Sequence, residues 1–179
     1  MACITPGRDI QEVEARASLI GPGIAEMPER FRCSAEAFAW HEELLARRGN
    51  EYDPRVRSRI EFGRAVSAAA YIRICAARQD FIARVAARTE GYDALLMPTV
   101  AITAPPVSAF ADDREYFRLN GLILRNTAVI NFLDRCAATL PIQPPGTAPV
   151  GLMIVGEHGG DRRLLAIARG IETALVERR

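Results

Sequence analysis

The segment from residue 125 to residue 155 constrains the fold more than any other part of the chain. Two short apolar runs, 137–142 and 150–155, flank a link at 143–149 that is rich in proline and glycine. Apolar runs bounded by turn residues predict buried strands, and the link predicts a turn between them. A helix is predicted immediately before, over 116–133. This part of the chain must therefore form at least a small sheet beside helices.

Capping residues and apolar periodicity predict further helices upstream. Ser34 is a good N-cap for a helix over 34–48, and Asp53 with Pro54 suits the start of the next helix. Ser67 can cap a third helix that ends near Gly91. Its apolar stripe follows the helical period, with Arg78 as the one polar intrusion, at Tyr71, Ile74, Cys75, Arg78, Ile82, Val85 and Ala86.

The remaining pattern completes an alternation of strands and helices. Residues 94–97 are apolar and predict a buried strand, residues 99–113 predict a loop, and Asp161 can cap a final helix. The predicted class is α/β, with a small mixed sheet covered by long helices. Three apolar strands make a thin sheet, so we expect part of a larger one. We expect a weakly patterned segment over 1–33 and an α/β domain over 34–179.

Composition excludes several classes of function. The chain has 179 residues and a formal net charge of +1, which gives no broad electrostatic surface for nucleic acid. No apolar run is long enough to cross a membrane, and we see no signal peptide. The four cysteines, Cys3, Cys33, Cys75 and Cys136, form no C-x-x-C pair, which argues against a zinc ribbon or a disulfide scaffold. We expect free thiols in the cytoplasm and no bound metal.

Five segments, in order, resemble the amidase signature family, whose members hydrolyse carboxamides. They lie between Glu36 and Ala174. The segments are Glu36-Ala-Phe-Ala-Trp-His41, Tyr52-Asp-Pro-Arg-Val-Arg, Tyr92-Asp-Ala-Leu-Leu-Met-Pro-Thr99, Arg125-Asn-Thr through Asn131, and Pro149-Val-Gly-Leu. The resemblance implies the C-terminal portion of an amidase fold. It also implies an acyl transfer from a carboxamide to serine followed by hydrolysis, with no cofactor.

The Ser–Ser–Lys catalytic set that the resemblance implies is missing from this sequence. The chain contains no lysine, and no two of its serines are adjacent. A serine hydroxyl needs a neighbouring base to take its proton, and a buried lysine can be neutral near pH 7. Arginine stays protonated and cannot replace that lysine. We therefore assign no catalytic residue here and expect the chain to be inactive alone.

The resemblance also implies a candidate substrate-facing set, formed by Arg125, Thr127, Asn131 and Asp134. The alternative is structural, because short polar side chains such as those of Asn131 and Asp134 often cap or tie a helix end. Arg135 stands where a glycine is more usual in the resembled enzymes. We expect it to crowd the pocket or to require a different backbone angle.

Other polar residues have simpler interpretations. His41 is expected to be a packing or surface residue, with a base or ligand role as the alternative. Cys136 and His158 could form a Cys–His pair, although their spacing gives no support for it. The segment from Gly156 to Asp161 predicts a tight turn between strand and helix rather than a phosphate cradle, because its acidic residues would repel an anion.

Two hypotheses of function follow. In the first, the chain is a portion of an amidase whose catalytic part is missing, and it needs a polypeptide that carries the serine-rich loop and the lysine. In the second, it is a non-catalytic binding or interaction module that retains part of an amidase fold. In both, apolar faces left uncovered favour association, so we expect a homo-oligomer, with a two-fold dimer as the predicted form. The substrate in the parent enzyme would be a small-molecule amide, with no nucleic-acid or membrane partner.

Overall fold

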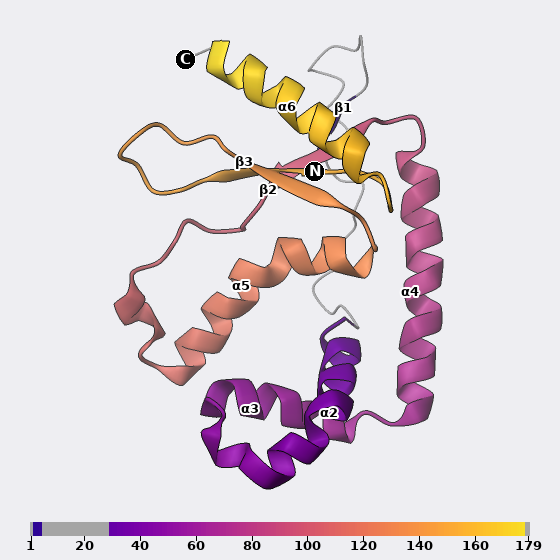
Figure 1. The fold of residues 1–179 in the computed structure, drawn as a ribbon, viewed down its shortest axis with the longest axis vertical. Helices are drawn as coiled ribbons and strands as arrows, with labels where there is room; N and C mark the ends of the chain where they lie inside the picture. Colours follow the sequence, from indigo (N-terminus) through magenta and orange to yellow (C-terminus); the bar gives the residue numbers. More distant parts are fainter. Residues whose placement is uncertain (1, 5–28, 178–179) are drawn as a thin grey trace. The chain divides into compact units, whose positions relative to one another are not determined.

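The computed structural model describes residues 2–4 and 29–177 (Figure 1). The chain divides into two compact units, which we describe separately. One unit is Ala25–Arg84, and the other holds the first strand together with Val85–Arg179. Most of the predicted N-terminal segment 1–33 lies outside the described residues, so its boundary with the domain stays a prediction.

The first unit is helical. It contains α2 (Glu29–Arg48), a 3-10 turn at Gly49–Glu51, α3 (Pro54–Glu61), a second 3-10 turn at Phe62–Ala65, and the first part of α4 (Ala68–Thr89). The Asp53 carboxylate accepts hydrogen bonds from the backbone N–H groups of Arg55 and Val56, which confirms its capping role. Ser67 caps α4 through the N–H of Ala70 at 3.2 Å, as predicted.

The predicted start of the first helix at Ser34 is wrong. The helix α2 begins five residues earlier at Glu29, so Ser34 lies inside it.

The turn that follows α3 requires a glycine at position 63, because a Cβ there would lie 1.9 Å from the backbone oxygen of Ser34. The second 3-10 turn therefore contacts the backbone of α2 directly.

One polar cluster joins α2 to α4 within this unit. The Tyr71 hydroxyl donates a 2.9 Å hydrogen bond to Glu36 Oε1, which also accepts from Arg32 Nη1 at 2.6 Å. The bond to Glu36 is the main reason that the pKa of Tyr71 rises to about 12, with a further bond to Cys75 and burial adding to the effect. The neutral phenol is thereby favoured.

The second unit is built on a four-stranded sheet. Its strands are β1 (Ala2–Ile4), β2 (Ala94–Pro98), β3 (Ala137–Pro141) and β4 (Gly151–Val155), in the order β1-β2-β4-β3. The helices of this unit are the end of α4, α5 (Asp113–Phe132) and α6 (Asp161–Glu177), with a short 3-10 turn at Val107–Phe110. The α/β class is confirmed. In detail, all three strand pairings are antiparallel, so the described sheet is not of the mixed kind that we expected.

Helices cover both faces of this sheet, as its continuous apolar strands require (Figure 1). On one face, Ala94 and Ile154 pack against Leu164 and Ala168 of α6. Strand residues alternate between the faces, so Leu95, Met153 and Val155 point to the other face, where α5 lies. The buried residues of α5 are Leu119, Asn126, Val129, Ile130 and Phe132. The core of the unit therefore has three layers, helix, sheet and helix.

Candidate functional site

The end of α5 turns into β3 through a left-handed residue. Asp134 has φ 57°, and the N–H groups of Asp134 and Arg135 donate to the carbonyls of Asn131 and Ile130 at 3.1 and 3.3 Å. This pair of bonds is the Schellman motif, in which glycine normally occupies the left-handed position. Aspartate is one of the few other residues that tolerate it. Asn131 and Asp134, two of the candidate site residues, therefore lie at a helix end that these two bonds close through the backbone, and a capping role for their side chains stays a prediction.

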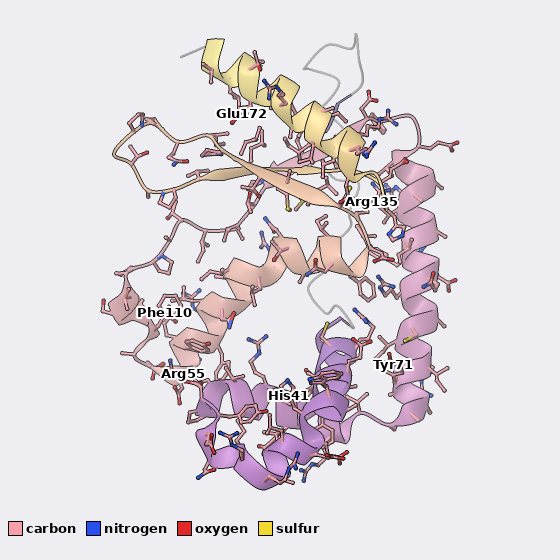
Figure 2. All side chains as sticks on the ribbon, viewed as in Figure 1. His41, Arg55, Tyr71, Phe110, Arg135 and Glu172 are labelled. Carbon is pink, nitrogen blue, oxygen red and sulfur yellow. The ribbon has the colours of Figure 1, made fainter. Side chains whose placement is uncertain are left out.

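Arg135 does not adopt the unusual backbone angle that was one of the two expectations for it. Asp134 is the only residue other than glycine with a positive φ among those that the structure describes, so the unusual backbone angle falls one position before Arg135. The half-buried guanidinium of Arg135 donates a 2.6 Å hydrogen bond to Thr89 Oγ1 at the end of α4 (Figure 2). Thr89 is 5% exposed. Arg135 thus ties the start of β3 to α4.

The helix separates the other candidate residues. At about 100° per residue, Thr127 and Asn131 lie about 40° apart on one face of α5, whereas Arg125 lies about 160° from Thr127. The Thr127 hydroxyl donates to the Leu124 carbonyl at 3.1 Å, and Asn131 is exposed. The exposed Arg125 donates through Nε to Asn126 Oδ1 at 3.3 Å. The structure brings Thr127 and Asn131 together and leaves Arg125 on another side.

Asn126 is the residue that sequence reasoning missed in this region. It is 8% exposed, and its amide Nδ2 donates a 2.8 Å hydrogen bond to the carbonyl of Pro98 at the end of β2. Asn126 therefore positions Arg125 on one side and fixes α5 to the sheet on the other. The signal was present in the sequence, because Asn126 is the centre of the Arg125-Asn-Thr segment, but nothing in the local pattern showed that it was buried.

A close contact between three strands lies at the same end of β2. The hydroxyl oxygens of Thr99 and Thr139 are 3.2 Å apart. They lie over Gly151, where an added Cβ would be 2.6 Å from Thr99 Oγ1 and 2.7 Å from Thr139 Cγ2. The Thr99 N–H also donates to the Gly151 carbonyl at 2.9 Å. The glycine of the Pro149-Val-Gly-Leu segment is thus explained by packing.

The Cys136 thiol and the His158 ring bond to backbone groups. Cys136 Sγ donates to the carbonyl of Glu157 at 3.0 Å, and His158 Nδ1 lies 2.8 Å from the carbonyl of Asp134 and 3.5 Å from its carboxylate. These contacts join the turn before α6 to the turn before β3. They favour a structural role over a nucleophilic pair.

His41 likewise has a partner within its own unit. Its Nδ1 lies 2.8 Å from the Tyr52 hydroxyl, and the two rings meet edge to face.

Among residues 2–4 and 29–177, no group of three or more His, Cys, Asp or Glu side chains is arranged to hold a metal ion. No helix in the same residues has the length and apolarity needed to span a membrane.

Comparison with known proteins identifies the family. The amidase family model matches residues 24–165. The chain belongs to the amidase family. It is 32% identical over 143 residues to the 2-amino-5-chloromuconic acid deaminase of Comamonas testosteroni, covering 79% of this chain and 31% of the deaminase. It is 29% identical over 140 residues to a glutamyl-tRNA(Gln) amidotransferase subunit of Symbiobacterium thermophilum, covering 75% and 28% of the two chains.

A solved amidase structure confirms the fold. It superposes with a TM-score of 0.67 at 27% identity, covering 86% of this chain and 36% of the solved chain. This amidase-family chain therefore spans about a third of the length of the relatives that it matches.

Proposed function

We propose that this chain forms part of an amidase that cleaves the C–N bond of a small carboxamide. The observation that carries the proposal is the family match over residues 24–165, joined to an amidase-like fold. The names of two relatives, a deaminase and an amidotransferase, denote removal and transfer of nitrogen-containing groups. The reaction would transfer an acyl group from the carboxamide to a serine, release the amine or ammonia, and then hydrolyse the acyl-serine with water.

The chemistry of this reaction requires groups that the present sequence lacks. With no lysine and no adjacent serines, the chain has neither the base nor the serine pair of the family. We infer that a further polypeptide segment supplies them and that this chain alone does not turn over amides. Its contribution is a structural wall beside the reacting groups.

We assign Arg125, Thr127, Asn131 and Asp134 to that wall. Arg125 and Asn131 are exposed, so their side chains are accessible to a ligand. Asn126 holds the Arg125 guanidinium at 3.3 Å, which restricts its position. Asp134 is exposed at the left-handed turn that follows α5. An exposed guanidinium and an exposed carboxamide offer hydrogen-bond donors for the carboxylate or carbonyl oxygens of a substrate.

The association partners follow from the same proposal. Leu165 and Val176, which are 64% and 65% exposed, lie on the outer side of α6. Exposed apolar side chains favour association with a second copy or with the remainder of an amidase. We place the protein in the cytoplasm, with a small amide as substrate and no nucleic-acid or membrane partner.

Ammonia release from a panel of simple amides tests the proposed function. The purified chain should show no turnover above a buffer blank. Addition of a polypeptide that carries the serine-rich loop and the lysine should give turnover that depends on that serine. Serine-dependent turnover by the chain alone would contradict the missing-catalyst proposal, and its absence in the complemented mixture would contradict the amidase proposal itself.

Kinetics of the complemented mixture test the assigned wall. Arg125→Ala should raise KM, because it removes a donor to the substrate. Arg118→Ala is the matched control in the same helix, since Arg118 pairs with Glu115 one turn away. Equal KM values for the two variants would remove Arg125 from the site.

A further inference from the structure

One side of α6 carries two apolar residues with two opposite charges between them. The helix packs its inner residues against the sheet, which leaves its other sides open (Figure 1). At about 100° per residue, four exposed side chains fall within about 60° of one another on one of those sides. We call these four residues the α6 stripe, and in chain order they are Leu165, Arg169, Glu172 and Val176.

The spacing of the α6 stripe is that of a helix-pairing seam. The positions follow one another at intervals of four, three and four residues, as positions d, a, d and a of a heptad repeat do. A seam of this kind packs along a second helix. Its outer positions, Leu165 and Val176, are apolar, whereas its two middle positions are charged. A partner helix must therefore supply the opposite charges at the level of Arg169 and Glu172, because a charge that loses water without a partner is costly.

The two charged side chains of the stripe are available for such a partner. In the part of the chain that the structure describes, neither the guanidinium of Arg169 nor the carboxylate of Glu172 forms an ion pair or hydrogen bond. The Thr173 hydroxyl donates to Arg169 only at its backbone carbonyl, at 3.0 Å. Arg163 of the same helix differs, since it pairs with Asp93. The charges of the stripe thus have no function in holding α6 to its own unit.

A second copy of α6 supplies the required charges when it runs antiparallel. Around a two-fold axis, the sequence numbers of two facing residues have the same sum at every level of an antiparallel helix pair. The pair Leu165 and Val176 meets this condition in the same register as the pair Arg169 and Glu172. One register therefore satisfies the apolar and the charged positions together. A parallel pair would instead place each charge opposite its own copy.

We propose that the α6 stripe is a two-fold homodimer interface in which α6 packs antiparallel against α6 of a second copy. Two Arg169–Glu172 ion pairs would lie between two Leu165–Val176 contacts. The proposal goes beyond the proposed function, because the pairing needs neither an amide nor the catalytic segment. A single helix buries less than the roughly 800 Å² per partner of a standard interface, so we expect a dissociation constant above about 1 μM.

Exchange of the two charges tests the pairing in the full chain. Arg169→Glu places two carboxylates opposite each other at each charged level, and Glu172→Arg places two guanidinium groups there. Each variant alone should raise the dimer dissociation constant at least about tenfold, as measured by sedimentation velocity over a concentration series. A mixture of the two variants should associate as tightly as the unmodified chain, because each supplies the charge that the other lacks.

A control separates the pairing from a change in net charge. Arg73→Glu makes the same change at an exposed residue of α4 and should leave the dissociation constant unchanged. Circular dichroism and thermal unfolding verify that each variant keeps the fold. A second measurement uses the unmodified chain, whose dimer should weaken as salt is added, because salt screens exposed charges. It stays decisive if a variant fails to fold.

Three results would overturn the proposal. These are a monomeric unmodified chain up to about 1 mM, an unchanged dissociation constant in Arg169→Glu, or a mixture of the two charge variants that associates no better than either alone. If the α6 stripe contacts the remainder of an amidase instead, the unmodified chain stays monomeric and Arg169→Glu lowers ammonia release in the complemented mixture, which also overturns the dimer. A dimer without ammonia release in that mixture would support the interface and contradict only the proposed function.

Discussion

The side-chain amide of Asn126 donates a 2.8 Å hydrogen bond to the backbone carbonyl of Pro98, which fixes α5 to the end of β2. Asn126→Leu keeps a similar volume but leaves that carbonyl without its donor. We expect the free energy of unfolding to fall by about 1–3 kcal/mol. Asn120→Leu is the matched control in α5, since Asn120 makes no such bond among the described residues. Chemical denaturation that gives equal losses for both would contradict the role of Asn126.

The bond between Arg135 and Thr89 leads to a second prediction. Hydrogen bonds to charged groups contribute about 1.5–3 kcal/mol, and the Thr89 hydroxyl is buried. Arg135→Met and Thr89→Val should each destabilise the protein, and the double variant should lose less than the sum. A double-mutant cycle from urea unfolding should give a coupling energy of about 1 kcal/mol. Strict additivity would show that the bond contributes nothing.

The sequence predicted most of the elements because their signals are local. Asp53 caps α3 as expected, and the apolar run at 94–97 became β2. The start of α2 was misplaced because Ser34 satisfies the local rule for a cap, whereas the helix continues through it. Capping propensity cannot show whether a residue lies at a helix end or inside the helix.

The candidate site was less predictable because its geometry depends on contacts between distant segments. Asn126 and Pro98 are separated by 28 positions, and Arg135 and Thr89 by 46. One of the two expectations for Arg135 was an unusual backbone angle, but Asp134, one residue earlier, adopts it. Family resemblance indicated the candidate segment, and only the structure showed which of its side chains bond within the protein.

The left-handed conformation of Asp134 leads to a third prediction. Asp134→Gly and Asp134→Ala both remove the carboxylate near His158, and they differ only by the Cβ atom. Because a Cβ is unfavourable at φ 57°, the glycine variant should be the more stable by about 1 kcal/mol. Thermal unfolding of the pair checks this. A more stable alanine variant would mean that the turn does not adopt this conformation.

Two glycines should respond to alanine in opposite directions. Gly151→Ala would place a Cβ within 2.6 Å of Thr99 Oγ1, and we expect a loss of about 1–3 kcal/mol. Gly170 lies within α6 with no atom within 4 Å of an added Cβ, so Gly170→Ala should gain about 0.5–1 kcal/mol from helix propensity. Urea unfolding of both variants tests the packing around Gly151, and a neutral result there would contradict it.

The raised pKa of Tyr71 predicts that stability depends on alkaline pH. The hydrogen bond to Glu36 raises the pKa of this phenol from 10.0 to about 12 in the folded chain. Because the folded state holds the proton more tightly, the contribution is fully present below pH 10 and is lost as pH rises through 12. The difference in unfolding free energy between the unmodified chain and Tyr71→Phe should therefore change in this window, with the unmodified chain losing stability. Parallel curves would contradict the prediction.

A second measurement is absorbance at the tyrosinate band. The titration midpoint of Tyr71 should move back toward 10 in Glu36→Gln, because the accepting carboxylate is then gone.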